Sequence, residues 1–226
     1  MKVLVSDFDL TIYPKAYAEN IKLANQFIAA GNVFIIATGR NLKSLLNRLE
    51  GTNLNYSYLI CNDGGVIYDK NHNVVYKTNL DLQTAKEIFT LLINYNKEAK
   101  IDNGYELDTV VKDEVNKLLV RYEDETTGKL LLDQVTNQYP SVHGYLSTNY
   151  INIVELTVSK ASAINYLAQM NQYKDIYVVG DNVNDISMFK EYYGYSIDTS
   201  IEEIRKLSKR YVNSFIDVIK DIEKDD

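Results

Sequence analysis

Short apolar runs alternate along the chain with longer segments in which apolar residues recur every three or four positions. The runs Val3–Val5, Val33–Ala37 and Tyr58–Cys61 are continuous rather than alternating, which is typical of strands covered on both faces. The segment Ala18–Ala30 has helical periodicity, and Gly31 follows it where a helix would end. This first part of the chain therefore predicts parallel strands joined by helices.

The pattern changes after Lys77. A helical segment over residues 80–99 precedes several short β-like pieces and a second helical segment. The β-like pieces are Leu107–Val111, Lys117–Tyr122, Ser141–Ser147 and Ile151–Val158, and the second helical segment is Thr126–Gln138. Apolar and polar residues alternate along Tyr150–Leu156, which predicts an antiparallel sheet with one solvated face.

The first pattern returns after residue 156, with a helix at Lys160–Met170, a strand at Ile176–Val179 and a helix after Asn184. A strand near Tyr195–Ile197 and an amphipathic helix at Ser214–Glu223 follow. The predicted fold class is α/β: a Rossmann-like parallel sheet core with helices on both faces, plus an inserted α+β cap domain. We expect residues 1–79 and 156–226 to form the core, and residues 80–155 to form the cap.

Composition and charge exclude several classes of protein. Acidic residues outnumber basic ones by 31 to 24 among 226 residues, for a net charge of −7, so nucleic acid is not an expected partner. The single cysteine, Cys61, rules out an intrachain disulfide, and with only two histidines a zinc site is not expected. No apolar run approaches the roughly 18 residues of a membrane span. We expect a cytoplasmic protein, monomeric or weakly dimeric.

Polar residues follow the strands of the predicted parallel sheet. These stretches are Asp7-Phe8-Asp9-Leu10-Thr11, Thr38-Gly39-Arg40, Asn62-Asp63-Gly64-Gly65 and Gly180-Asp181-Asn182-Val183-Asn184-Asp185. Four of their residues are the aspartates Asp7, Asp9, Asp181 and Asp185. The carboxyl ends of parallel strands meet at one edge of a sheet, so we expect these carboxylates to converge. Clustered carboxylates repel one another unless a cation lies between them, and hard oxygen ligands favour Mg²⁺.

The same stretches carry a family resemblance. Asp7–Thr11 matches the DxDx[TV] motif of the haloacid dehalogenase (HAD) superfamily, Thr38 its second motif, Lys160 its third and Gly180–Asp185 its GDxxND motif. The chain thus resembles Cof-type HAD phosphatases, whose cap lies between the second and third motifs. The match covers the core from end to end. The insertion resembles the C2B-type cap of that family only in length and pattern.

The resemblance implies a Mg²⁺-dependent phosphatase that hydrolyses small phosphorylated metabolites, such as sugar phosphates, through an aspartyl-phosphate intermediate. Asp7 would be the nucleophile and Asp9 the general acid and base. The residues expected to contact the substrate or its phosphate are Phe8, Thr38, Gly39, Arg40, Lys160 and Asn184. Those expected at the metal are Asp7, Asp9, Asp181 and Asp185.

Several alternatives stay open at this point. Asp185 either binds the metal directly or holds Lys160 or a metal-bound water, and Arg40 and Asn62 either reach the substrate or brace loops. A phosphomutase would share the motifs, and a signalling module that carries a phosphoaspartate would share the Mg²⁺ site. A further hypothesis is that residues 80–155 move on hinges near Lys77–Leu80 and Glu155–Lys160.

Overall fold

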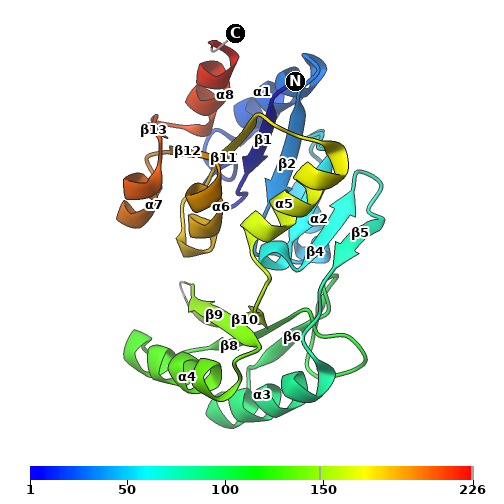
Figure 1. Cartoon of the computed structure of the whole chain (residues 1–226), viewed down its shortest axis with the longest axis vertical. Helices are drawn as coiled ribbons and strands as arrows, with labels where there is room; N and C mark the ends of the chain where they lie inside the picture. The colour runs from blue at the N-terminus through cyan, green and yellow to red at the C-terminus, as the bar shows by residue number, and fades with distance from the viewer. Residues whose placement is uncertain (148, 225–226) are drawn as a thin grey trace.

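Two β-sheets lie one above the other along the long axis of the molecule (Figure 1). The computed structural model describes residues 1–147 and 149–224. The larger sheet has the strand order β13-β12-β11-β1-β2-β3-β4-β5. Its strands are β1 (Val3–Ser6), β2 (Val33–Ala37), β3 (Tyr58–Cys61), β4 (Val66–Asp69), β5 (Val74–Lys77), β11 (Ile176–Val179), β12 (Tyr193–Ser196) and β13 (Arg210–Tyr211).

Helices cover both faces of the larger sheet, as the sequence predicts. Along β1, Leu4 packs on one face, and Val3 and Val5 pack on the other, because successive side chains of a strand point in opposite directions. The helices on the Leu4 face are α1 (Tyr17–Ala29), α2 (Leu42–Leu49) and α8 (Phe215–Lys224). Those on the other face are α5 (Lys160–Asn171), α6 (Ile186–Glu191) and α7 (Glu202–Leu207).

The structure corrects the prediction at one edge of this sheet. Strands β4 and β5 were not predicted; they form a hairpin that pairs antiparallel with β3. The sheet is therefore parallel only from β13 to β3. The helix expected over residues 80–99 is shorter, and strand β6 begins at Lys100. Helix α7 and strand β13 were not predicted either.

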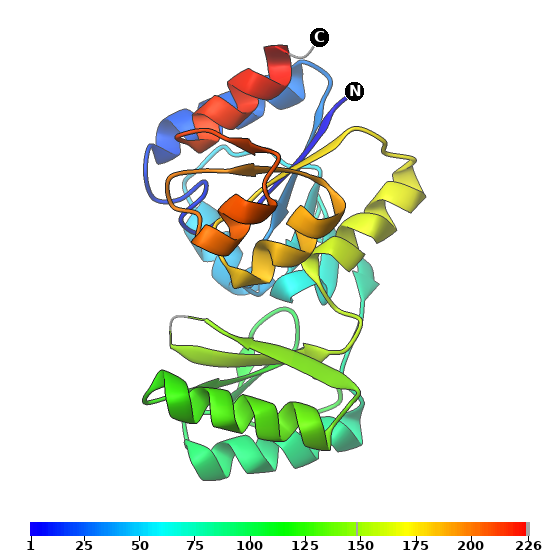
Figure 2. The ribbon, with the colours of Figure 1, turned by 60° about the vertical axis from the view of Figure 1, so that its left-hand side comes forward.

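The smaller sheet is antiparallel, with the order β7-β6-β8-β10-β9. Its strands are β6 (Lys100–Asp102), β7 (Leu107–Asp108), β8 (Lys117–Arg121), β9 (Val142–Leu146) and β10 (Tyr150–Glu155). One face packs its apolar side chains against helices α3 (Leu82–Tyr95) and α4 (Glu125–Gln138). The opposite face turns toward the larger sheet (Figure 2). The polar face that was expected to meet solvent therefore faces the core.

The chain passes between the two sheets twice, after β5 and again between β10 and α5. The elements from α3 to β10 fall within the predicted cap, residues 80–155. The exact division into domains at these positions stays a prediction, as does movement about the two crossings. Within the described part of the chain, no helix has the length and apolar character needed to cross a bilayer.

Candidate active site

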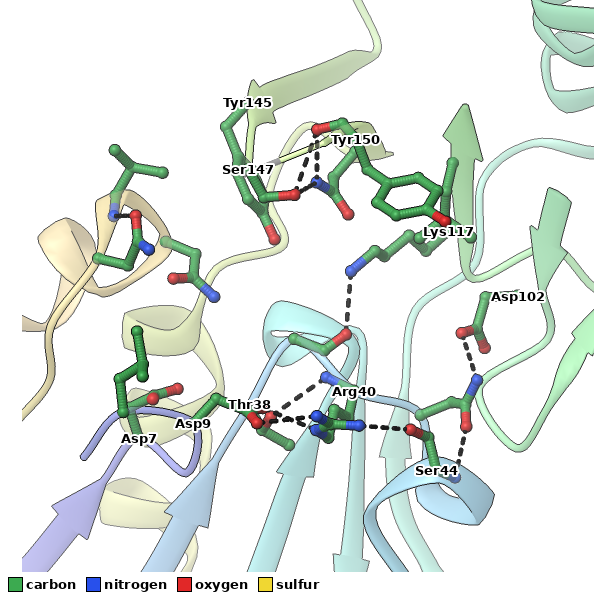
Figure 3. Close-up of a pocket in the computed structure, with 18 of the residues that line it drawn as sticks. Asp7, Asp9, Thr38, Arg40, Ser44, Asp102, Lys117, Tyr145, Ser147 and Tyr150 are labelled. Atoms are coloured by element: carbon green, nitrogen blue, oxygen red, sulfur yellow. Dashed lines mark hydrogen bonds and ion pairs between the residues drawn. The ribbon is translucent and has the colours of Figure 1, made fainter. Parts of the chain in front are cut away.

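A cavity of about 600 Å³ lies between the carboxyl ends of the core strands and the polar face of the smaller sheet (Figure 3). Its floor includes residues that follow β1, β2 and β11, and its roof includes residues of β6, β8, β9 and β10. Three of the four stretches that the sequence analysis singled out, those after β1, β2 and β11, thus meet at one place, whereas Asn62–Gly65 is not among the lining residues. They meet because parallel strands end at the same edge of the sheet.

Three carboxylates gather at the base of this cavity. One oxygen from each of Asp7, Asp181 and Asp185 lies within 4.8 Å of the others, and all three residues are buried. The Asp185 Oδ2 atom accepts hydrogen bonds from the backbone amides of Asp181, at 2.9 Å, and Asn182, at 3.0 Å. Asp185 therefore shapes the loop that presents Asp181.

Lys160 is the cation that meets this cluster. It is the first residue of α5, which Ser159 caps, and its side chain is fully buried. Its Nζ atom donates to Asp7 Oδ1 and to Asp185 Oδ1, each at 2.6 Å. Burial alone would lower the pKa of Lys160, but the charges of Asp185 and Asp7 raise it above the ordinary value. Lys160 therefore remains an ammonium.

One ammonium does not balance three carboxylates. Burial raises the pKa of Asp7 well above its usual range, and the charges of Asp185 and Asp181 add to this effect against the opposing charge of Lys160. Burial, followed by the charge of Asp185, raises the pKa of Asp181 to about 7. Crowded, buried carboxylates with excess negative charge are the donor set that a hard divalent cation prefers. The residues present therefore fit Mg²⁺.

Asp9 lies beside this cluster, at the cavity wall, and Arg40 holds it. The Arg40 Nε and Nη2 atoms donate to the two oxygens of Asp9 at 2.7 and 2.8 Å, and Nη1 donates to Ser44 Oγ at 2.9 Å (Figure 3). A bidentate guanidinium pair orients a carboxylate more strictly than a single bond does. Arg40 thus pairs with Asp9 and also lines the cavity; its contact with a substrate stays a prediction.

The predicted phosphate-binding loops are also at the cavity. Thr38 and Gly39 follow β2 and line the cavity, and the Thr38 hydroxyl accepts a bond from the Arg40 amide at 3.2 Å. A Cβ atom at Gly39 would lie 3.0 Å from Asp63 Oδ1, so a larger residue would crowd the loop. The Phe8 side chain points away: it is fully buried and stacks on Tyr13 with centroids 5.8 Å apart. Phe8 as a whole does not line the cavity, and its contact with a substrate stays a prediction.

The sequence analysis missed Lys117, and it named Asp63 only as part of a strand-end stretch, without a role. Lys117, from β8 of the smaller sheet, donates to Asp63 Oδ2 at 2.7 Å and to the Gly39 carbonyl at 3.0 Å. Asp63 also accepts a bond from Asn184 Nδ2 at 2.9 Å. Lys117–Arg121 carries three consecutive apolar residues between two cations, so no alternation assigns Lys117 to a face of its strand. Nothing in the sequence pairs it with Asp63.

The remaining strand-end candidate, Asn62, braces the junction of the two sheets. It is buried, and its Nδ2 atom donates to Asn116 Oδ1 at 2.7 Å. Asn116 in turn donates to the carbonyls of Gly65 and Thr78, at 2.9 and 2.7 Å. Asn62 does not line the cavity. The structure thus places it among the contacts that hold the loops together.

The register of the strands in the smaller sheet determines which side chains form the roof of the cavity. Lys100, Leu119, Asn152 and Tyr145 are successive cross-strand partners on β6, β8, β10 and β9. All four line the cavity, together with Tyr150 and Ser147. Apart from Leu119, these side chains carry hydrogen-bonding groups. The roof is therefore a polar surface that can meet a hydrophilic ligand.

Comparison with known proteins shows which family the chain resembles. The family model of the haloacid dehalogenase-like hydrolases matches residues 4–109 and 93–215. Together these two segments span most of the chain, including every strand-end stretch described above.

Individual relatives are more distant. The *Bacillus subtilis* 5-amino-6-(5-phospho-D-ribitylamino)uracil phosphatase YcsE is 25% identical over 203 residues, covering 84% of this chain and 81% of that protein. A haloacid dehalogenase-like hydrolase structure from *B. subtilis* has a TM-score of 0.88 at 15% identity, covering 99% of both chains. The HAD subclass IIB sugar phosphatase BT4131 has a TM-score of 0.78 at 16% identity, covering 99% of this chain and 98% of its own. These two structural likenesses show the fold.

Proposed function

The chain belongs to the haloacid dehalogenase-like hydrolase family, and we propose that it is a Mg²⁺-dependent phosphatase of small phosphorylated metabolites. The observation that carries this proposal is the cluster of Asp7, Asp181 and Asp185 around the buried Lys160, at the base of a roofed cavity. Asp9 lies at the same cavity and supplies a second carboxylate for acid and base chemistry.

The ion would be held by Asp7 and Asp181, with the Asp9 backbone carbonyl beside them. When bound, Mg²⁺ supplies positive charge that shields a phosphate dianion from the carboxylates. Both Asp185 oxygens already accept bonds from Lys160 or from the backbone of its loop. We therefore assign Asp185 to holding Lys160 and shaping that loop.

The reaction proceeds in two displacements at phosphorus. In the first, a carboxylate oxygen of Asp7 bonds to phosphorus as the ester P–O bond breaks, and Asp9 gives its proton to the leaving oxygen. In the second, water attacks phosphorus and gives a proton to Asp9. The bond between phosphorus and Asp7 breaks, which releases inorganic phosphate. In this structure Arg40 holds both oxygens of Asp9, so one of these two bonds opens before Asp9 carries a proton.

The other floor residues would stabilise the transferring group. Thr38 offers a hydroxyl, and Asn184 an amide, at the cavity wall, and Lys160 adds a fixed positive charge through Asp7. The polar roof suits a leaving group rich in hydroxyl or amide groups, as in a sugar phosphate or a related metabolite. The names of YcsE and BT4131 support this substrate class.

The test is phosphate release from a panel of phosphorylated metabolites and from p-nitrophenyl phosphate. We expect continuous release in Mg²⁺, loss of release in excess EDTA and recovery when Mg²⁺ is restored. An isomerised sugar phosphate without free phosphate would identify a phosphomutase instead. A stable phosphoprotein without turnover would identify a signalling module.

A further inference from the structure

A buried ion pair crosses from the smaller sheet to the core. The side chains of Lys117 and Asp63 are only 3% and 5% exposed, with Nζ and Oδ2 2.7 Å apart. The Lys117 ammonium also donates to the carbonyl of Gly39, next to Thr38. Another ion pair between the two parts, Lys43 with Glu106, is about half exposed. The Lys117 pair is thus buried next to the site, whereas the Lys43 pair is at the surface.

The second oxygen of Asp63 holds a residue of the catalytic loop. Asp63 Oδ1 accepts from the Asn184 amide at 2.9 Å, and Asn184 lies between Asp181 and Asp185 in the chain. Burial alone would raise the pKa of Asp63, but Lys117 and the bond from Asn184 lower it to about 2. Asp63 is therefore an anion that links the cap lysine to the amide that faces the cavity.

The backbone leaves Asp63 little freedom except side-chain rotation. Asp63 has φ +60°, and Gly64 follows with φ +108°. A Cβ atom at Gly64 would lie 2.0 Å from the carbonyl oxygen of Ser159, the residue that caps α5. The turn is wedged against the helix that begins at Lys160. The direction of the Asp63 carboxylate is therefore set by its partners Lys117 and Asn184, with Tyr145 also beside it: burial, and then the charge of Asp63, raises the pKa of Tyr145.

We propose that Lys117 and Asp63 are positioning residues. When the smaller sheet is packed against the core, Lys117 binds Asp63, and Asp63 orients the Asn184 side chain for phosphate binding. This inference rests on the proposed phosphatase function. With Lys117 in place, Asp63 directs one oxygen to the lysine and the other to Asn184. Without Lys117, the buried carboxylate takes up a proton or turns toward the charge of Lys160, and Asn184 loses its orientation. The phosphate-binding site is therefore complete only when the smaller sheet is packed against the core.

The first experiment tests whether Lys117 acts through Asn184. We expect Lys117→Met to lower kcat/KM for p-nitrophenyl phosphate by about tenfold, the effect of one misplaced charge-stabilising group. Asn184→Ala should lower it similarly, and the double variant no further. If the fold-losses in kcat/KM of the two single variants multiply in the double variant, the proposal is overturned, because Lys117 would then act independently of Asn184. Lys43→Met, which removes the exposed ion pair, should change kcat/KM less than twofold.

The second experiment separates positioning from folding. Asp63→Asn/Lys117→Met and Asp63→Leu/Lys117→Met both remove the charged pair, so neither leaves a buried charge alone. Asparagine can still accept the Asn184 bond, whereas leucine cannot. We expect the first double variant to stay within about threefold of the wild type and the second to lose about tenfold. Equal activities at equal melting temperature would overturn the proposal.

A binding readout distinguishes failure here from failure of the proposed function. Inorganic phosphate, titrated calorimetrically in Mg²⁺, should bind the Asp63→Leu/Lys117→Met protein more weakly than the Asp63→Asn/Lys117→Met protein. If the wild type hydrolyses no phosphate ester, the proposed function fails. If the wild type is active but the two double variants bind phosphate equally, only the proposed positioning of Asn184 by Lys117 and Asp63 fails.

Discussion

Two buried lysines beside the same cavity face clusters of different charge balance. Lys160 meets Asp7 and Asp185, with Asp181 in the same cluster, so negative charge remains in excess. Lys117 meets one carboxylate, Asp63, in a balanced pair. The pKa values divide accordingly: those of Asp7 and Asp181 are raised, whereas that of Asp63 is lowered to about 2.

This difference in charge balance distinguishes the two lysines: we propose that the Lys160 cluster binds a ligand, whereas the Lys117 pair joins the two sheets. A balanced buried pair needs nothing further, and its role is to hold two parts of the molecule in register. An unbalanced cluster is unfavourable on its own and gains from a cation. We therefore propose the Lys160 cluster as the place for Mg²⁺ and chemistry; the Lys117 pair joins the roof to the core beside it.

The largest expected effect comes from neutralising the unbalanced cluster. Asp7→Asn keeps the shape of the side chain but removes the proposed nucleophile, so turnover should fall by on the order of 10³-fold or more. Phosphate release by the purified variant measures this. Because the substitution relieves repulsion, its melting temperature without Mg²⁺ should not fall below that of the wild type. Retention of a tenth of the wild-type rate would contradict the assignment of Asp7.

A smaller effect should appear when acid breaks the balanced pair. Since the pKa of Asp63 in the folded protein is about 2, below the ordinary 3.8, its contribution to stability is complete above about pH 5. That contribution is lost as the pH falls toward 2, and it amounts to about 2 kcal/mol. The free energy of unfolding of the wild type should approach that of Asp63→Asn by about 1 kcal/mol between pH 5 and pH 3.

Urea unfolding of both proteins at each pH measures this convergence. The raised pKa values of Asp7 and Asp181 act in the opposite direction, because protonation relieves their repulsion as the pH falls. Both proteins share that effect, so the comparison isolates Asp63. A constant difference across the range would show that Asp63 does not titrate as the pair requires.

The smallest expected effect concerns the roof away from both clusters. Lys100 is half-buried on β6 and lines the cavity. Lys100→Met should raise KM for the preferred metabolite by about threefold, as the loss of one partly exposed polar contact does. It should leave p-nitrophenyl phosphate hydrolysis unchanged, since that leaving group is small and activated. An equal effect on both substrates would place Lys100 in the chemistry rather than in selection.

The fold class and the floor of the site could be predicted from the sequence. The strands β1, β2, β3 and β11 are continuous apolar runs, and the residues that follow them carry the reactive groups. A side chain within a few residues of a strand end is placed by the topology of the sheet alone. The expected meeting of the strand-end aspartates is therefore seen in the structure. Their roles in binding metal and phosphate stay predictions.

The hairpin of β4 and β5 shows a limit of the same reasoning. Its strands have four residues each, as β1, β3 and β11 do, but only the three-residue 3-10 helix η1 (Asn62–Gly64) separates β4 from β3. A prediction that expects a helix after each strand does not identify two strands that follow each other directly. Arg40 shows another limit: its position after β2 was visible, but its bidentate pairing with Asp9 depends on two loops that meet only in space.

The sequence by itself determined that the chain forms an α/β core with four aspartates at one edge, because these features depend on local periodicity and on the order of strands. Only the tertiary structure decided that the polar face of the smaller sheet roofs the cavity, and that Lys117 meets Asp63. These two residues are 54 positions apart. Their contact depends on the register of β8 and on how two separate sheets pack together. Neither the strand register nor the packing of the two sheets can be read from a local sequence pattern, because both depend on which side chains lie close together in space.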